Sequence, residues 1–329
     1  MRHLAVIGGG AWGTALAMVA RRAGSLPRLW ARDPVVVATI NQRHENPLFL
    51  PGVILDSAIT ATTDMAVATE RAEAALLVVP AQFLRGVMQV LGSHLRRGLP
   101  LLLCAKGIET SSLKTMSEVA AEILPACPWA VLSGPTFAAE VARELPTAVT
   151  IASGDPSLGH ALIEALGSSR FRPYLSQDPV GAEIGGAVKN VLAIACGIVV
   201  GRGLGDNARA SLITRGLAEM IRLGVAKGGR AETFGGLSGL GDLVLTCSSG
   251  QSRNFGLGLA LGRGRPLDAA LRGSRSVVEG VATAASIARV AERLGIEMPI
   301  AAGVDALLHR GEAVDAVIDL LLRRPYRAE

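Results

Sequence analysis

The sequence predicts an α/β fold in which an amino-terminal, doubly wound sheet precedes a mostly α-helical carboxyl-terminal domain. Three observations predict it. Short apolar runs alternate with helical patterns from residue 3 to about residue 176, a glycine-rich turn follows the first run, and after about Pro179 only helical patterns continue. We therefore expect one domain over residues 1–178 and a second over residues 179–329.

Length and composition are those of a globular protein with two domains. The 329 residues exceed what one hydrophobic core usually supports. Hydrophobic residues make up 50% of the chain and charged residues 19%, which excludes a disordered or fibrous protein. The longest apolar runs, AALLVVPA and VLAIACGIVVG, are shorter than the roughly 20 residues that span a bilayer, and no signal peptide is recognisable. We expect no membrane span and a cytoplasmic location.

Cysteine spacing and charge exclude several other classes. The four cysteines are scattered and form no CxxC pair, which disfavours a zinc site and a disulfide framework and favours buried, reduced thiols. A net charge of +5, two Tyr and six Phe offer no basic stripe with stacking aromatics. We therefore expect neither a metal nor a nucleic acid as a partner, whereas a small anionic substrate fits the charge.

The strands and helices of the first domain follow from local patterns. Asp33-Pro34 and Asp155-Pro156 each combine a helix N-cap with proline in the first turn, so a helix is expected to begin at each. The predicted strands are HLAVI, PRLWA, ITATT, AALLVV, PLLLCA, WAVLS, TAVTIA and RPYLS, and their alternation with helices favours a parallel sheet.

The second domain is predicted from long helical patterns separated by glycine-rich turns. These patterns are GAEIGGAVKNVLAIACGIVV, ARASLITRGLAEMIRLGVAK, VATAASIARVAERLG and AVDAVIDLLLRR.

A glycine motif lies between the first strand and the first helix. Gly8, Gly10 and Gly13 form a GxGxxG pattern, in which the glycines permit a tight turn, close approach of a pyrophosphate, and close packing of helix on strand. The amino terminus of the helix then faces the phosphates. The motif predicts that residues 1–178 form a dinucleotide-binding domain of the Rossmann type, although glycines at such a turn also occur for structural reasons alone.

The end of the second predicted strand bears on the choice of cofactor. Arg32 and Asp33 lie about 20 residues after the glycines, where an arginine accommodates the additional phosphate of NADP and an acidic residue binds the ribose hydroxyl of NAD. Arg32 favours NADPH, because its planar guanidinium suits a phosphate. Asp33 keeps NADH possible, because an acidic residue can bind the ribose hydroxyl of NAD, although Asp33 is also a natural N-cap.

Lys189 is the most unusual residue of the helical domain. On a helix its neighbours are small and apolar: Ala182, Gly185, Gly186, Leu192, Ala193 and Cys196. Such a face leaves room for a ligand to reach the ammonium group, which would then serve in proton transfer. The alternative is a lysine whose stem covers apolar surface while its ammonium reaches water.

Other polar residues lie where ligands commonly bind. Lys106 follows the strand PLLLCA, and Gly134, Pro135 and Thr136 open a predicted helix after WAVLS. Each also has an ordinary interpretation, since Lys106 suits a solvated loop and Thr136 suits a helix cap.

A further group occurs in GGLSGLGDLVLTCSSGQSRNFG. Ser252, Arg253 and Asn254 precede a helical pattern, where a hydroxyl, a guanidinium and an amide suit a phosphate. Helix capping by Ser252 or Asn254, and a turn role for Asp242, are the alternatives.

Taken together, the motifs resemble those of bacterial NAD(P)-dependent glycerol-3-phosphate dehydrogenases over nearly the whole chain. The resemblance is carried, in order, by GGGAWGTALA, NPLFLPG, VPAQFLR, AKGIE, SGPTFAAEV, GAEIGGAVKNVLAIACGI, GLGDLVLTCSSGQSRN and VEGVATA.

The resemblance implies roles for individual residues. Lys189 is implied to be the catalytic acid and base, with Asn190 supporting it. Substrate contacts are implied for Lys106, Gly134, Thr136, Lys189, Asn190, Asp242 and Thr246, and contacts to its phosphate for Ser252, Arg253 and Asn254. Cofactor contacts are implied for Ala11, Trp12, Arg32, Asp33, Phe49, Lys106, Ala138, Arg253, Val277 and Glu279, beside Gly8, Gly10 and Gly13 of the glycine motif.

The implied reaction is the reversible, NADPH- or NADH-dependent reduction of dihydroxyacetone phosphate to sn-glycerol 3-phosphate, a precursor of glycerophospholipids. Residues 179–329 would then be the substrate-binding and catalytic domain, and a homodimer is implied as well. The chain departs from the family pattern at Phe49, where tyrosine is frequent, and at Asp33, where histidine or another polar residue is frequent. The alternatives are a dehydrogenase of hydroxy acids with a related domain arrangement, and a nonenzymatic NADPH-binding sensor.

Overall fold

The computed structural model describes residues 1–272 and 277–325, and its contacts divide the chain into two compact units. The first unit comprises Met1–Lys106 and Lys114–Glu183, and the second comprises Gly107–Leu113 and Ile184–Glu329. The chain therefore enters the second unit briefly after its seventh strand before it returns to the first. Two side chains of the second unit hold this short segment: the Ser286 hydroxyl donates to the Ile108 carbonyl at 3.1 Å, and Arg289 donates to the Thr110 carbonyl at 3.0 Å.

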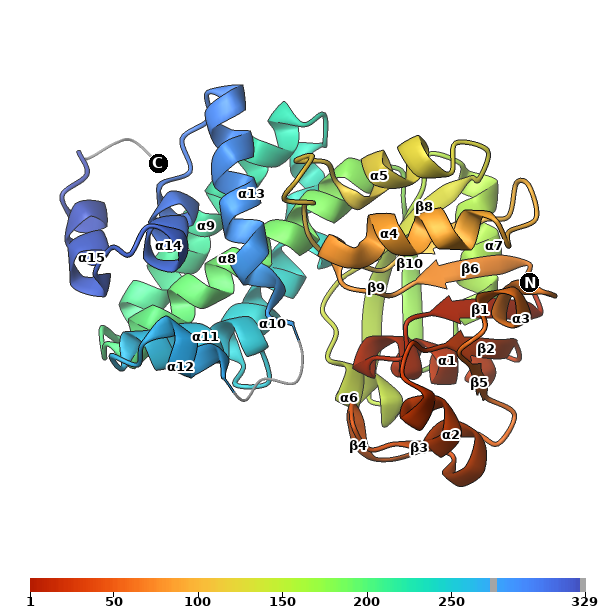
Figure 1. Ribbon diagram of the computed structural model, residues 1–329. Helices are drawn as coiled ribbons and strands as arrows, with labels where there is room; N and C mark the ends of the chain where they lie inside the picture. The colour runs from red at the N-terminus through yellow and green to blue at the C-terminus, as the bar shows by residue number, and fades with distance from the viewer. Residues whose placement is uncertain (273–276, 326–329) are drawn as a thin grey trace. The chain divides into compact units, whose positions relative to one another are not determined.

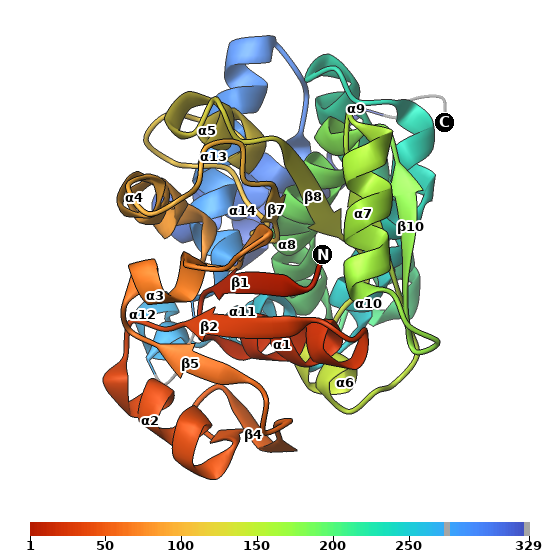
Figure 2. The ribbon, with the colours of Figure 1, turned by 90° about the vertical axis from the view of Figure 1, so that its right-hand side faces the viewer.

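An eight-stranded sheet in the order β10-β9-β8-β7-β6-β1-β2-β5 forms the centre of the first unit. Figure 2 shows β1, β2 and β5 side by side. The eight predicted strands are confirmed: β1 (His3–Ile7), β2 (Leu26–Trp30), β5 (Thr60–Thr62), β6 (Ala74–Leu77), β7 (Leu101–Leu103), β8 (Trp129–Ser133), β9 (Thr147–Ala152) and β10 (Phe171–Ser176).

One pair of strands departs from the expected parallel arrangement. All neighbouring pairs of this sheet are parallel except β8 and β9, which are antiparallel with Leu132 opposite Ile151. The helix that connects these two strands, α6 (Ala138–Ala142), has only five residues. A parallel crossover normally uses a longer helix that lies along the sheet, so this connection returns the chain in the opposite direction.

Alternation along the strands produces two cores, one on each face of the sheet. Val6 and Leu76 contribute to one core, and Ile7 and Leu77 contribute to the other. The first core is covered by α1 (Ala11–Arg22), α2 (Pro34–Arg43), α6 and α7 (Pro156–Leu166). The second is covered by α3 (Met65–Thr69), α4 (Ala81–Gly92) and α5 (Met116–Ile123). Figure 1 shows α4 and α5 on the side of the sheet opposite to α1 and α2.

The predicted helix starts are confirmed by their hydrogen bonds. Asp33 caps α2 by accepting from the Val35 N–H at 2.8 Å, and Asp155 caps α7 by accepting from the Ser157 N–H at 2.8 Å. Both carboxylates satisfy donors that the helix itself leaves unpaired.

A small hairpin in the first unit was not predicted. Strands β3 (Glu45–Asn46) and β4 (Leu50–Ile54) form a separate two-stranded antiparallel sheet within the NPLFLPG motif. Pro47 and Pro51 obscure a strand pattern in this segment, because proline removes a backbone donor.

The second unit is helical, as predicted. Its helices are α8 (Pro179–Gly201, whose first residues belong to the first unit), α9 (Gly205–Ala226), α10 (Asp242–Ser248), α11 (Arg253–Gly262), α12 (Leu267–Leu271), α13 (Glu279–Leu294), α14 (Pro299–His309) and α15 (Val314–Leu322). A 3₁₀ turn, η1 (Ala231–Gly235), and a π-helical turn, η2 (Leu237–Gly241), precede α10. Of these, α10, α14 and the short α12 have no counterpart among the sequence predictions.

Helix α8 lies directly against the backbone of α11. A Cβ atom on Gly197 would lie 2.1 Å from the Phe255 carbonyl oxygen, and one on Gly258 would lie 2.0 Å from the Ile194 carbonyl oxygen. Only glycine permits such an approach, so the small residues of α8 serve helix packing.

The length and hydropathy of α8 (1.8 in its most apolar window) would also allow it to cross a membrane. However, 89% of that window is buried in the structure, which is typical of a core helix. Its uninterrupted apolar run, VLAIACGIVVG, is shorter than a membrane span, whereas the whole helix is long enough. The four cysteines are all buried and none forms a disulfide, as expected.

Candidate functional site

Two glycines of the GxGxxG motif are required by the fold itself. Gly8 has a φ of 136°, and a Cβ atom there would lie 2.9 Å from the Val78 carbonyl carbon. A Cβ atom on Gly13 would lie 1.8 Å from the Gly8 carbonyl oxygen. The turn out of β1 and the packing of α1 therefore exclude larger residues at both positions.

Gly10 differs, because no atom lies within 4 Å of a Cβ atom built on it. It is the N-cap of α1, where no side chain caps the helix and no acidic residue occupies the first turn. The first N–H groups of a helix have no partner inside the helix and attract anions. The fold alone thus gives no reason for glycine at this position, whereas a phosphate bound close to the backbone does.

Six other residues expected at the cofactor belong to the same unit as this loop and differ in exposure. Ala11 and Trp12 form the half-buried first turn of α1, and Phe49 and Ala138 pack against the same core as α1. Arg32 is exposed after β2, and Asp33 is exposed while it caps α2. The capping interpretation of Asp33 is therefore confirmed, and its role toward a cofactor stays a prediction.

Lys106, Gly134 and Thr136 meet at the carboxyl ends of β7 and β8. The Lys106 ammonium donates to the Gly134 carbonyl at 3.0 Å, and the Thr136 hydroxyl donates to the same oxygen at 3.2 Å. Lys106 is thus half-buried and bonded rather than a fully solvated loop residue. Residues 134–136 do not open a helix as expected, because α6 begins at Ala138 after the N-cap Phe137.

Lys189 is buried, with 6% of the residue exposed, so its ammonium does not reach toward bulk water. Its Nζ donates to Asp242 Oδ1 at 2.6 Å and to Thr246 Oγ1 at 3.0 Å. The Thr246 hydroxyl also donates to Asp242 Oδ1 at 3.2 Å. The alternative interpretation of Lys189 as a surface-reaching lysine is therefore wrong.

The Lys189 partners Asp242 and Thr246 both lie on α10, and η2 packs against α8 next to them. Asp242 is the first residue of α10 and is fully buried, so its expected alternative as a turn aspartate is also wrong. A Cβ atom on Gly185, one turn before Lys189, would lie 2.3 Å from the Ser238 carbonyl oxygen. The small residues beside Lys189 thus admit the backbone of η2, rather than only leaving space for a ligand.

Asn190 and Asn254 form a second buried polar contact beside Lys189. Asn254 Nδ2 donates to Asn190 Oδ1 at 3.0 Å, and Asn254 Oδ1 accepts from the Gly280 N–H at 3.0 Å. Asn254 therefore connects α8, α11 and α13 and is not an N-cap. Asn190 fixes α11 beside Lys189, and no hydrogen bond between Asn190 and Lys189 is observed in the described part of the chain.

Ser252 and Arg253 mark the beginning of α11. The Ser252 hydroxyl caps this helix by accepting from the Phe255 N–H at 3.2 Å, as its capping interpretation predicted. The exposed Arg253 guanidinium donates to the Val277 carbonyl at 2.8 Å. Glu279, two residues after Val277, is the first residue of α13. An anion at this helix start would meet both the guanidinium and the free N–H groups of α11.

Among the buried carboxylates that no sequence pattern predicted, Glu183 and Glu219 have raised pKa values. Glu183 on α8 accepts from the Ser117 N–H at 2.8 Å and from the Ser117 hydroxyl. Glu219 on α9 accepts from the N–H groups of Ile300 at 2.7 Å and Ala301 at 3.1 Å. Burial raises the pKa of each carboxyl to about 7, although these hydrogen bonds act in the opposite direction. Their only signal in the sequence is an acidic residue on an otherwise apolar helix face.

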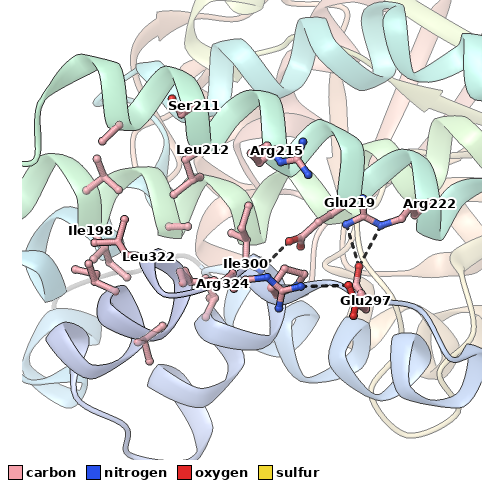
Figure 3. A pocket seen from close by; sticks show the side chains of 18 of the residues that line it. Ile198, Ser211, Leu212, Arg215, Glu219, Arg222, Glu297, Ile300, Leu322 and Arg324 are labelled. Carbon is pink, nitrogen blue, oxygen red and sulfur yellow. Dashed lines mark hydrogen bonds and ion pairs between the residues drawn. The ribbon is translucent and has the colours of Figure 1, made fainter. Parts of the chain in front are cut away.

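Glu219 also lines a mostly apolar pocket of about 1330 Å³ within the second unit. Helices α8, α9, α14 and α15 form its walls. Figure 3 shows Glu219 pointing toward the start of α14, while Arg222 and Arg324 point toward Glu297. These polar groups bind one another or the backbone, and apolar side chains form most of the remaining wall. The pocket is therefore mostly apolar, whereas the Lys189 cluster is polar.

Comparisons with known proteins identify the family. Residues 3–159 match the profile of the NAD-dependent glycerol-3-phosphate dehydrogenase N-terminus, and residues 178–319 match that of the corresponding C-terminus. The chain belongs to the NAD-dependent glycerol-3-phosphate dehydrogenase family. This confirms the resemblance inferred from the motifs.

Members of this glycerol-3-phosphate dehydrogenase family resemble the chain over its full length. A protein of Rhodospirillum rubrum named glycerol-3-phosphate dehydrogenase [NAD(P)+] is 59% identical over 99% of this chain and 94% of its own. A protein of Caulobacter vibrioides with the same name is 56% identical over 98% of both chains. The crystal structure of glycerol-3-phosphate dehydrogenase from Coxiella burnetii superposes with a TM-score of 0.95 at 39% identity, covering 98% of this chain and 99% of that one.

Proposed function

We propose that the protein catalyses the reversible reduction of dihydroxyacetone phosphate to sn-glycerol 3-phosphate with NADPH as the preferred cofactor. The observation that carries this proposal is the buried Lys189 ammonium, oriented by Asp242 and Thr246 on a helix of the family's C-terminal region. Family membership supports a nicotinamide cofactor, and Arg32 is our reason to favour NADPH over NADH.

Residues of the first unit would hold the cofactor. The open space at Gly10 and the uncapped start of α1 fit a pyrophosphate, and exposed Arg32 fits a 2′-phosphate. The remainder of the cofactor would be contacted by Ala11, Trp12, Phe49 and Ala138. When bound, the nicotinamide supplies the hydride that the ketone carbon receives.

Lys189 would act on the oxygen of that ketone. Its Nζ carries the proton that the developing alkoxide needs, and its positive charge stabilises the alkoxide before the proton moves. Asp242 and Thr246 fix the direction in which the ammonium points. In the oxidation direction the neutral amine would accept the proton from the alcohol.

The phosphate of the substrate would bind at the start of α11. Arg253 and the N–H groups of the first turn supply the positive potential, while Asn254 fixes α11 against α8. Binding energy from this remote group would orient the carbonyl for reaction, so that a substrate without phosphate loses rate as well as affinity. Substrate contacts by Lys106, Gly134 and Thr136 stay a prediction from the family resemblance.

A direct assay tests the proposal. Purified protein is mixed with dihydroxyacetone phosphate and either NADPH or NADH, and the absorbance of the reduced cofactor is followed. Dihydroxyacetone and a set of 2-keto acids serve as controls for the phosphate requirement. Turnover of keto acids in place of the phosphorylated ketone would favour a hydroxy-acid dehydrogenase, and tight NADPH binding without any turnover would favour a sensor.

Substitution of Arg32 by alanine tests the cofactor preference. We expect Arg32→Ala to weaken NADPH by about tenfold to a hundredfold and NADH by less than about twofold, since a guanidinium–phosphate contact of this kind contributes about 1.5–3 kcal/mol. KM values for both cofactors provide the measurement. Equal losses for the two cofactors would contradict the assignment of Arg32 to the 2′-phosphate.

We further expect the enzyme to act in the cytoplasm as a homodimer that supplies the precursor of glycerophospholipids. Analytical ultracentrifugation of the purified protein tests the oligomeric state.

A further inference from the structure

The NPLFLPG hairpin contains a buried side chain that reaches the glycine loop. Asn46, at the end of β3, is 1% exposed. Its Nδ2 donates to the Gly9 carbonyl at 3.0 Å and to the Thr14 hydroxyl oxygen at 2.8 Å. One amide thus joins the hairpin to the turn between β1 and α1 and to the second turn of α1.

The identity of the two atoms of this amide follows from its partner. A backbone carbonyl can only accept a hydrogen bond, so the atom that faces Gly9 must be the nitrogen of Asn46. The oxygen, Oδ1, is then buried without a hydrogen-bond partner among the described residues. A buried acceptor without a partner destabilises a fold, and an apolar side chain of similar volume avoids that cost. The Asn46 nitrogen offsets part of this cost, because it satisfies the Gly9 carbonyl and the Thr14 hydroxyl oxygen. The unpaired oxygen still destabilises the fold, so an amide at this position calls for an explanation beside stability.

That explanation lies in the geometry of the Gly9–Gly10 peptide. The peptide is planar and trans, so its carbonyl oxygen and its N–H point in opposite directions. When Asn46 holds the Gly9 carbonyl toward the protein interior, the Gly10 N–H is directed away from Asn46. This N–H lies at the uncapped beginning of α1, beside the open space at Gly10.

Two backbone hydrogen bonds also hold this loop, from the Gly8 N–H to the Trp30 carbonyl at 3.0 Å and from the Thr14 N–H to the Gly10 carbonyl at 3.0 Å. Neither of these two bonds involves the Gly9 carbonyl or the Gly10 N–H, the two polar groups of the Gly9–Gly10 peptide. A Cβ atom on Gly9 would lie 2.4 Å from the Ala31 side chain, so the loop is packed against the end of β2 on that side. Two consecutive glycines next to Gly8 otherwise permit many backbone orientations. Asn46 supplies the side-chain contact that selects one of them.

We propose that Asn46 is a positioning residue that orients the Gly9–Gly10 peptide and thereby presents the Gly10 N–H to the pyrophosphate of the dinucleotide. The proposal rests on the proposed function only in assuming that a nicotinamide dinucleotide binds at this loop. Asn46 itself does not touch the cofactor in this scheme. Through the same amide, the hairpin that carries Phe49 is tied to the phosphate-binding turn.

Asn41 provides a matched control within the same unit. Its Nδ2 donates to the Ala61 carbonyl at 2.9 Å, and its Oδ1 accepts from the Ala61 N–H at 2.8 Å. Asn41 is thus another asparagine that binds a backbone carbonyl, but it binds the edge strand β5 and not the glycine loop. Thr14→Val is a second control, because it removes one partner of Asn46 and keeps the bond to Gly9.

The experiment measures dissociation constants by titration of the purified full-length variants with NADPH and with 2′-AMP, which lacks the pyrophosphate. We expect Asn46→Ala and Asn46→Leu to weaken NADPH by about tenfold, to change 2′-AMP by less than twofold, and to leave kcat at saturating NADPH within about twofold of the wild-type value. Asn41→Ala and Thr14→Val should change NADPH affinity by less than about twofold.

Thermal unfolding shows which variants are folded, and Asn46→Leu retains the side-chain volume should the alanine variant fail to fold. Equal NADPH affinities for Asn46→Leu and Asn41→Ala would overturn the proposal, as would parallel losses of NADPH and 2′-AMP affinity, which indicate general disorder of the unit. Failure of the wild-type protein to bind either NADPH or NADH would instead overturn the proposed function.

Discussion

Asp242 and Glu219 are both carboxylates that the second unit buries, but different groups surround them. Asp242 meets an ammonium and a hydroxyl, both of them side-chain donors, with the Lys189 Nζ at 2.6 Å. Glu219 meets two backbone N–H groups at the start of α14, where no side chain of that helix caps its end. One carboxylate therefore orients a group that is able to carry a proton, and the other completes a helix.

The difference shows how to separate function from architecture among buried charges. A carboxylate that binds backbone N–H groups satisfies donors that every helix leaves unpaired, so its role is explained by the fold. A buried ammonium–carboxylate pair is a poor source of stability, because the cost of removing both charges from water offsets much of their attraction. The pair of Lys189 and Asp242 is thus better explained by chemistry than by stability.

The largest expected effect is the loss of turnover on removal of the ammonium. Lys189→Met should reduce kcat by roughly two to four orders of magnitude, the usual scale for a general acid and base, while NADPH binding is retained. Steady-state kinetics with dihydroxyacetone phosphate and NADPH titration provide the measurements. Lys114→Met, which removes a lysine exposed beside Glu122, is the control. Near-normal turnover of Lys189→Met would show that the pair of Lys189 and Asp242 has only a structural role.

Removal of the carboxylate should have a smaller effect on turnover and a clear effect on stability. Asp242→Asn leaves Lys189 buried without its ion-pair partner, and breaking such a pair costs about 3–5 kcal/mol. We expect kcat to fall by about tenfold to a hundredfold, because the amine loses orientation and stabilisation of its charge. Denaturant unfolding and steady-state kinetics measure the two effects. Unchanged kcat in a folded variant would show that Asp242 does not orient the catalytic amine.

The corresponding change at Glu219 should leave the chemistry intact. Glu219→Gln is expected to keep kcat and both KM values within about twofold, since the residue lies at the α9–α14 contact. A loss of turnover as large as that of Asp242→Asn would contradict the distinction between the two carboxylates.

The dependence of stability on pH provides the smallest and most specific effect. The pKa of Glu219 rises to about 7 in the folded protein from an ordinary value near 4.5, because burial disfavours the charge. The folded state therefore binds the proton more tightly than the unfolded state, and the stabilisation present below about pH 4.5 is lost as the pH rises through about 7. The loss for this group is up to about 3 kcal/mol. Glu183 should behave in the same way in the first unit.

Thermal unfolding between about pH 5 and about pH 8 measures this linkage. The unfolding temperature of the wild-type protein should fall as the pH rises over that range. In Glu219→Gln the unfolding temperature of the second unit should depend less on pH. Glu297→Gln removes an exposed charge close to Glu219 and controls for net charge. An identical pH profile for wild type and Glu219→Gln would exclude burial of an ionisable group at this position.

Local patterns were sufficient for much of the first unit. The eight strands, the helix starts at Asp33 and Asp155, and the glycine turn all follow from residues close together in the chain. Apolar alternation, capping carboxylates and the conformational freedom of Gly8 act over a few residues, so they can be recognised without tertiary information. The unusual position of Lys189 could be recognised for the same reason, since its small neighbours lie on the same helix.

Contacts between distant residues decided the rest. The direction of β9, the partner of the Lys189 ammonium 53 residues away, and the bond from Asn46 to Gly9 all depend on how separate elements pack. Asn254 resembled a helix cap in the sequence, yet it joins three helices. Residues close together in the chain were enough to predict the eight strands of the main sheet, the longest helices, the glycine turn and the family. Only the tertiary structure decided which buried charge meets which donor, because burial and pairing are properties of the packed chain and not of any one segment.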